Sequence, residues 1–220
     1  MKEKILLVGD THGEIELINE AIIIGKEKNC KKILQLGDFG FFPNLYPNFI
    51  NSLFSPIPFF FIDGNHDDHS VLPHNEKSPI PLYKLGYEVD NFFYIPRGYS
   101  EKWGESKILF IGGAKSIDKQ YRTLGLDWWV NEEISYMDFN AASSYIEIDI
   151  IISHTCPINE EIYYIESDYS SRALMELINL YNPRYLIHGH HHTNYELLMG
   201  KTIIKGLGCK PRDMFQVLYV

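Results

Sequence analysis

Five short polar segments of the sequence carry side chains that bind metal ions or transfer protons. In chain order, these side chains are Asp10, His12, Asp38, Asn65, His66, His154, His190 and His192. Carboxylates, an amide oxygen and imidazoles together suit borderline or hard divalent cations such as Zn²⁺, Fe²⁺ and Mn²⁺. Gathering such groups without a partner costs several kcal/mol. The pattern therefore predicts a metal site assembled from distant parts of the chain.

The number of these groups indicates two ions. The predicted metal ligands are Asp10, His12, Asp38, Asn65, His154, His190 and His192. They exceed what one such ion binds, and they suffice for two ions that share one carboxylate. No cysteine is placed for a structural tetrahedral zinc site. Two ions about 3.5–4 Å apart are a standard arrangement for in-line displacement at phosphorus.

Each polar segment follows a short apolar run that is typical of a buried β-strand. The runs are Ile5–Val8, Ile33–Leu36, Phe59–Ile62, Ile150–Ile152 and Tyr185–Ile187. Between the first two runs, Glu14–Lys28 repeats apolar residues at helical spacing, which predicts a βαβ unit. Ligands bind beyond the carboxyl ends of strands in open α/β sheets. We therefore expect the five segments to meet at one edge.

The rest of the chain predicts a single α/β domain over residues 1–220. Further helices are predicted over Ser171–Leu180 and Ser135–Tyr145, and the proline-rich stretch after Asp38 is expected to form loop or short helix. The last third predicts antiparallel strands at Tyr195–Leu198, Thr202–Lys205 and Gln216–Val220. No repeat or linker divides the chain.

Composition excludes several classes of protein. The 220 residues are 45% hydrophobic and 22% charged, as in ordinary globular proteins. The net charge of −9 argues against bulk binding of nucleic acid or an anionic membrane. The three cysteines of the chain form no C-x-x-C pair, and the first apolar run is too short for a signal peptide. No run reaches the about 18 apolar residues of a membrane span, so we expect a cytoplasmic protein.

Together the five segments resemble the calcineurin-like metallophosphoesterase superfamily. Its pattern is D-x-H, G-D, G-N-H-[DE], a single His and G-H-x-H. The corresponding segments here are Asp10-Thr11-His12, Gly37-Asp38, Gly64-Asn65-His66-Asp67, His154 and Gly189-His190-His191-His192. The resemblance covers nearly the whole chain. It implies a four-layer αββα sandwich of two mixed β-sheets flanked by helices.

The resemblance also implies a role for each residue. One metal would be held by Asp10, His12, Asp38 and His192, and a second by Asp38, Asn65, His154 and His190. A water bridging the two ions would be the nucleophile. His66 would protonate the leaving alkoxide, oriented by Asp67. The expected cofactors are two divalent ions per chain, Mn²⁺ first, with Fe, Zn or Ni as alternatives.

The sequence departs from the protein phosphatases of this superfamily. Those proteins carry G-D-x-x-D-R-G and R-G-N-H-E, and their two arginines clamp the substrate phosphate. Here neither arginine is present, and Asp63 precedes G-N-H. Arg122 or Arg97 would replace the clamp, unless each only forms a surface salt bridge. Trp128 and Trp129 would offer a base-stacking face or belong to the core.

Loss of the arginine pair favours a phosphodiester substrate, because a monoanionic diester needs less charge neutralisation. We expect a small phosphoester or nucleotide substrate, including nucleotides or nucleic-acid ends. The alternatives are a phosphomonoesterase (including a protein phosphatase), a catalytically silent scaffold on the same fold, and a single-metal hydrolase of non-phosphate esters. The sequence predicts no particular oligomeric state.

Overall fold

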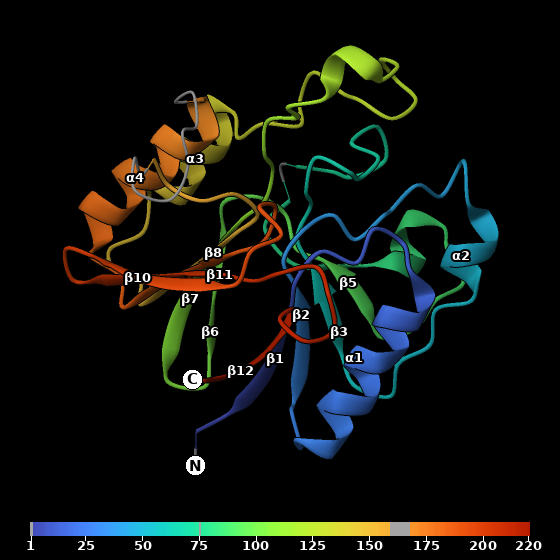
Figure 1. The fold of residues 1–220 in the computed structure, drawn as a ribbon, viewed down its shortest axis with the longest axis horizontal. Helices are drawn as coiled ribbons and strands as arrows, with labels where there is room; N and C mark the ends of the chain where they lie inside the picture. The colour runs from blue at the N-terminus through green and yellow to red at the C-terminus, as the bar shows by residue number, and fades with distance from the viewer. Residues whose placement is uncertain (1, 75, 159–167) are drawn as a thin grey trace.

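The computed structural model describes residues 2–74, 76–158 and 168–220, which contain two six-stranded β-sheets (Figure 1). The first sheet has the strand order β12 (Phe215–Tyr219), β1 (Lys4–Val8), β2 (Lys32–Gln35), β3 (Phe59–Phe61), β5 (Phe92–Tyr94) and β4 (Ile80–Pro81). The second has the order β10 (Tyr195–Met199), β11 (Thr202–Gly206), β9 (Tyr185–His188), β8 (Ile150–Ser153), β7 (Ser106–Ile111) and β6 (Tyr99–Trp103).

In each sheet the four inner strands run parallel and the two edge strands antiparallel. In the first sheet β1, β2, β3 and β5 are parallel, with Val8 paired to Gln35 and Gln35 paired to Phe61. In the second sheet β7, β8, β9 and β11 are parallel. The carboxyl ends of the inner strands therefore lie together at one edge of each sheet, where the predicted site residues follow.

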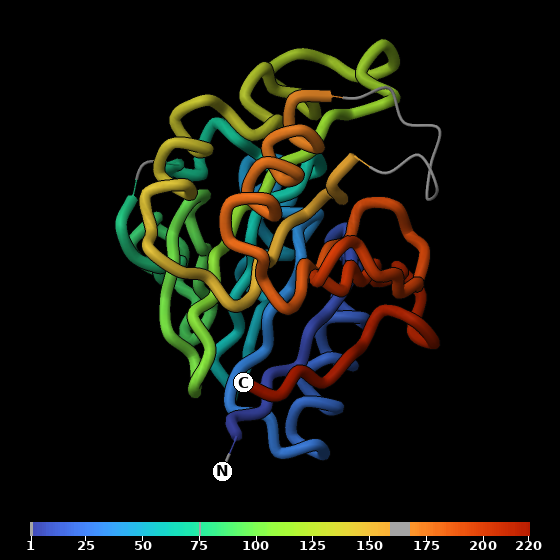
Figure 2. Tube along the Cα trace, turned by 90° about the vertical axis from the view of Figure 1, so that its left-hand side faces the viewer, coloured from blue at the N-terminus to red at the C-terminus, as the bar shows by residue number. Residues whose placement is uncertain are grey.

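The prediction for the last third of the chain is only partly right. β10 and β11 form the expected antiparallel hairpin, but β11 also pairs in parallel with β9. β12 leaves the hairpin and pairs with β1 in the other sheet, as Figure 2 shows for the two chain ends. The alternation of buried residues along a strand reports its buried face and not the direction of its neighbours.

Helices cover the outer faces of the two sheets (Figure 1). α1 (Ile15–Glu27) and α2 (Pro47–Asn51) lie beside the first sheet, and α3 (Tyr136–Ala142) and α4 (Tyr169–Tyr181) beside the second. Two 3₁₀ turns, η1 (Leu82–Leu85) and η2 (Lys119–Tyr121), complete the elements of the described residues. The helices predicted at Glu14–Lys28 and Ser171–Leu180 are confirmed, while the one predicted at Ser135–Tyr145 is shorter.

The core consists of three apolar clusters, one in each space between the four layers. One packs Ile18 of α1 against the first sheet, and another packs Leu174 of α4 against the second. The third lies between the sheets and includes Leu7, Phe110 and Ile152. The predicted four-layer αββα sandwich is therefore confirmed. No helix in the described part of the chain is both long and apolar enough to cross a bilayer.

Candidate metal centre

The loops that follow β1, β2, β3, β8 and β9 bring all seven predicted ligand side chains into one site. Asp10 and His12 follow β1, Asp38 follows β2, and Asn65 follows β3. His154 follows β8, and His190 and His192 follow β9. The site thus lies where the carboxyl ends of both sheets meet, and each sheet supplies part of it.

The first group of donor atoms comes from Asp10, His12 and His192, which all lie within 4.8 Å of one another. Nε2 of His192 is 3.1 Å from Oδ2 of Asp10 and 3.1 Å from Nε2 of His12. Oδ2 of Asp38 lies 3.9 Å from Nε2 of His12. Two imidazole nitrogens that face each other beside carboxylates suit a cation that binds their lone pairs.

The second group comes from Asp38, His154 and His190, also within 4.8 Å of one another. Nε2 of His154 lies 3.2 Å from Oδ1 of Asp38 and 3.3 Å from Oδ1 of Asn65. The Asn65 amide donates from Nδ2 to Oγ of Ser116 (3.1 Å), so its oxygen is the atom left for a cation. Asp38 belongs to both groups, because Oδ2 is near His12 and Oδ1 is near His154.

Hydrogen bonds around the site orient the ligands as a metal centre requires. Nδ1 of His154 donates to the carbonyl of Leu36 (2.7 Å), which turns Nε2 toward Asp38 and leaves it as the nitrogen that would bind a cation after losing its proton. Both oxygens of Asp10 accept the backbone N–H of His190, at 3.1 and 3.0 Å. The donor chemistry and this outer set of bonds fit the two divalent ions that the sequence predicts.

The backbone is strained at several of the residues whose side chains form the site. Four of the ligand residues adopt left-handed conformations: His12 (φ 47°), Asp38 (φ 55°), His190 (φ 65°) and His192 (φ 53°). Such conformations are unfavourable for non-glycine residues and concentrate at functional sites. Gly64 is required for a different reason, because a Cβ there would collide with the Asp38 carboxylate and the His154 ring.

Charge balance around Asp38 dominates the electrostatics of the site. Asp38 is 1% exposed. Burial acts to raise its pKa, but the imidazoles of His154, His66 and His12 outweigh burial and hold the pKa well below its usual value. Burial likewise opposes the charge on His154, yet Asp38 raises the pKa of His154 to about 10. Asp38 thus stays anionic and needs a positive partner.

His66 and Arg122 lie beside the two donor groups. His66 donates its backbone N–H to Oδ1 of Asp38 (2.7 Å), and its ring lies 5.0 Å from that of His12. Arg122 contacts Nε2 of His66 and donates to the carbonyl of Asn65 (3.3 Å). Both side chains line a cavity of about 840 Å³ together with Asp38. Burial lowers the pKa of His66, and Arg122 adds to this lowering.

Arg122 also forms the salt bridge that the sequence left as its alternative. Its Nη2 lies 2.8 Å from Oδ1 of Asp118, whose side chain is half-exposed. That ion pair holds the guanidinium within the cavity rather than removing it from the site, because Asp118 lines the same cavity.

The carboxylate of Asp67 is bonded to the backbone of the loops around the site, not to the acid that it is expected to orient. Its carboxylate accepts the backbone N–H groups of Gly40 (2.9 Å), Phe41 (2.8 Å) and Gly64 (2.8 Å). Among the described residues it forms no hydrogen bond with the ring of His66. Asp67 therefore ties the loop after β2 to the loop after β3, and it stabilises the backbone that carries the ligands rather than orienting the acid.

Arg97 does not line the cavity over Asp38, where the substrate contact predicted for it would have to lie. Arg97 is 3% exposed, and its guanidinium donates to Oδ2 of Asp63 (2.8 Å from Nε) and to the carbonyl of Glu132 (2.9 Å). The pair is buried, unlike the surface bridge considered as its alternative. Asp63 and Arg97 join the end of β3 to the 112–134 segment, which runs from β7 toward α3 (Figure 1).

A further cluster of donor groups went unnoticed in the sequence. Asp63, His69 and His74 lie within 4.8 Å of one another. Arg97 forms an ion pair with the Asp63 carboxylate. Burial lowers the pKa of His69 to about 3, and the positive charge of Arg97 adds to this lowering. Nε2 of His69 contacts the carbonyl of Gly64 (2.9 Å). The cluster is a buried ion-pair network beneath the ligand loop, and no spacing in the sequence marks it.

Comparison with known proteins identifies the family. The profile of the calcineurin-like phosphoesterase family matches residues 3–194. The chain belongs to this family. A search of curated proteins gives no match.

Solved structures share the fold at low identity. A protein of Thermus thermophilus has 14% identity and a TM-score of 0.60, over 94% of this chain and 90% of that one. The GAP50 anchor of the Plasmodium inner membrane complex has 14% identity and a TM-score of 0.55, over 94% and 71%. A putative 5′-nucleotidase of Staphylococcus aureus has 12% identity and a TM-score of 0.55, over 100% and 53%.

Binding of Mn²⁺ is expected to release protons, because a cation must displace the proton on Nε2 of His154 before that nitrogen becomes a ligand. With the pKa of His154 raised to about 10, this proton is bound at neutral pH and is lost to the cation. Affinity for Mn²⁺ should therefore increase from acidic to neutral pH. Calorimetric titration in buffers of different ionisation enthalpy measures the protons released. A binding heat that does not depend on the buffer would contradict the prediction.

Proposed function

We propose that the chain is a phosphoesterase that holds two divalent cations, Mn²⁺ first, and hydrolyses small phosphodiesters. The observation that carries this proposal is the position of Asp38, with Oδ2 near His12 and Oδ1 near His154. A carboxylate between two imidazole-rich groups matches a centre in which two ions share one anion. Two cations there would activate water for attack at phosphorus and neutralise charge in the transition state.

His66 is the proposed general acid. His66 lines the cavity that Asp38 lines, where a leaving oxygen would take its proton. Burial lowers the pKa of His66, which makes its imidazolium a stronger acid. Arg122 donates to Nε2 of His66 in the structure, so His66 would carry the proton on Nε2 only once the guanidinium turns from Nε2 to the substrate phosphate.

Arg122 supplies the positive side chain that the missing arginine pair would have supplied. Its guanidinium lies beside Nε2 of His66, within the cavity, so a phosphate above Asp38 would accept hydrogen bonds from it. Lys115 and Lys119 line the same cavity, and with Arg122 they balance the carboxylates of Asp38, Asp118 and Asp168 that line it too. One guanidinium in place of two supports a monoanionic diester over a dianionic monoester.

The proposal is tested by comparing bis-p-nitrophenyl phosphate with p-nitrophenyl phosphate in the presence of Mn²⁺. We expect a higher kcat/KM for the diester, and loss of both activities with chelator. Replacing Asp38 by Asn should lower kcat/KM by more than about 100-fold, because the anion common to both ions is lost. Asp90→Asn, at an exposed carboxylate before β5, is the matched control.

Three outcomes would change the proposal. A strong preference for p-nitrophenyl phosphate would change the proposed substrate from a phosphodiester to a phosphomonoester. Full metal loading without turnover on a broad panel of phosphoesters would favour a scaffold. One ion per chain at saturation, with hydrolysis of carboxylic esters, would favour the single-metal hydrolase.

Replacement of Arg122 by Ala should lower kcat/KM for the diester by roughly 10- to 100-fold, since a hydrogen bond to a charged group contributes about 1.5–3 kcal/mol. Arg122→Lys should recover part of the loss, because it restores the charge but not the planar fork. Steady-state kinetics measures both, with the exposed Arg212→Ala as control. Unchanged KM and kcat in Arg122→Ala would remove Arg122 from substrate binding.

A further inference from the structure

A second cavity adjoins the metal centre on the side of α2. Its volume is about 550 Å³, within the range of small-molecule sites. Phe42, Leu45, Tyr46 and Phe49, from the loop after β2 and from α2, supply its apolar lining. His12 and His66 line it as well, and His66 also lines the cavity that contains Asp38 and Arg122. The two cavities therefore meet at the proposed acid.

The second cavity differs from the first in chemical character. None of the residues that line it is a lysine or an arginine, whereas Lys115, Lys119 and Arg122 line the cavity over the metal centre. A phosphate therefore belongs in the first cavity. The second suits an uncharged group with apolar surface.

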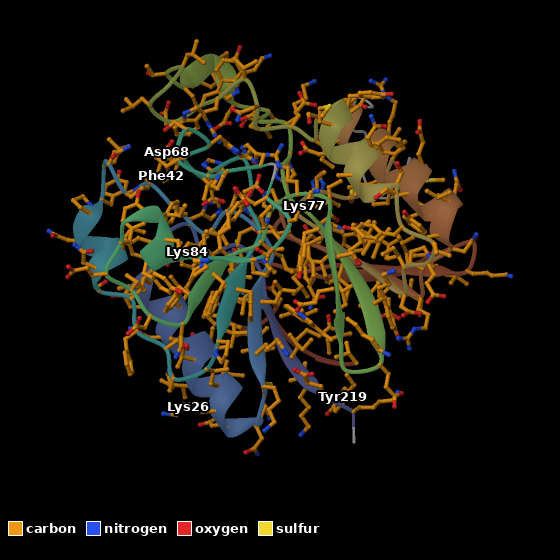
Figure 3. The ribbon with its side chains drawn as sticks, turned by 180° about the vertical axis from the view of Figure 1, so that it is seen from behind. Lys26, Phe42, Asp68, Lys77, Lys84 and Tyr219 are labelled. Atoms are coloured by element: carbon orange, nitrogen blue, oxygen red, sulfur yellow. The ribbon has the colours of Figure 1, made fainter. Side chains whose placement is uncertain are left out.

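Aromatic rings give the second cavity flat walls. The ring of Phe42 packs against that of Trp129 (centroids 5.8 Å apart), which is 7% exposed and belongs to the core. Figure 3 shows Phe42 below the 112–134 segment that carries this tryptophan. The ring of Tyr46 stands at 89° to that of Phe42 and is 61% exposed. Trp129 thus holds the ring of Phe42 in place, and the ring of Tyr46 is accessible to a ligand.

We propose that this cavity, named here the aromatic subsite (Phe42, Leu45, Tyr46 and Phe49), binds a planar aromatic group on the leaving alcohol of the substrate, of the kind that a nucleobase supplies. The proposal rests on the proposed function. With the phosphoryl group above Asp38, the oxygen that takes the proton of His66 lies between the two cavities. The rest of that alcohol then extends into the aromatic subsite. Stacking of a base on an aromatic side chain contributes about 1–3 kcal/mol.

The first test needs no turnover. Calorimetric titration with adenosine, and with ribose for comparison, measures binding of a neutral nucleoside. Adenosine should bind and ribose should not. Tyr46→Ala should weaken adenosine binding by at least about fivefold. Tyr83→Ala, at a similarly exposed tyrosine of η1, is the matched control and should bind as the unchanged protein does. Absence of adenosine binding, or equal affinity in Tyr46→Ala, would overturn the proposal.

The second test compares two diesters, methyl phenyl phosphate and methyl 2-naphthyl phosphate. Their leaving alcohols have similar acidity, but the naphthyl group has the larger aromatic surface. The unchanged protein should prefer the naphthyl ester by at least about fivefold in kcat/KM, and Tyr46→Ala should reduce that preference toward unity. Tyr83→Ala should keep the preference.

The two proposals fail in different ways. If both esters are hydrolysed at equal kcat/KM, the aromatic subsite is wrong while the phosphoesterase stands. If neither ester is hydrolysed although Mn²⁺ is bound, the phosphoesterase is wrong, and the adenosine titration alone decides whether the aromatic subsite exists.

Discussion

The structure depends on one buried carboxylate, that of Asp38, and on the positive charge that must surround it. A carboxylate that is 1% exposed costs several kcal/mol unless it is paired. Its partners come from both sheets: His12 follows β1 of the first sheet, and His154 follows β8 of the second. The centre therefore exists only if the two sheets pack in the correct relative position. The apolar cluster between them, which contains Leu7 and Phe110, sets that position.

Several buried interactions hold the ligand loops in their strained conformations. Asp67 accepts backbone N–H groups from Gly40 and Gly64 and so joins the loops after β2 and β3. Beneath them, Asp63 pairs with Arg97, and His69 contacts the carbonyl of Gly64. Left-handed residues such as Asp38 persist only where the surroundings determine the backbone fully. These contacts supply that determination for the loops that carry the candidate ligands.

The sequence predicted well which side chains meet at this edge, because its signal is local. A strand is recognisable from a few apolar residues, and the polar residue that follows it lies at the carboxyl edge, as Asp10, Asp38 and His154 do. What the sequence did not predict depends on partners far away in the chain. Asp67 follows His66 directly, but its hydrogen bonds go to Gly40 and Phe41. Likewise, no residue near Arg97 in the sequence indicates that Arg97 would form a buried ion pair with Asp63. The aromatic subsite arises where a proline-rich stretch folds against the site, which periodicity does not describe.

Anomalous diffraction from crystals loaded with Mn²⁺ tests the central claim most directly, because it locates each ion without reference to any reaction. The account predicts two peaks about 3.5–4 Å apart. One should lie beside Oδ2 of Asp38 together with His12, and the other beside Oδ1 together with His154. A single peak, or a pair of peaks in which Asp38 contacts only one ion, would contradict the shared carboxylate.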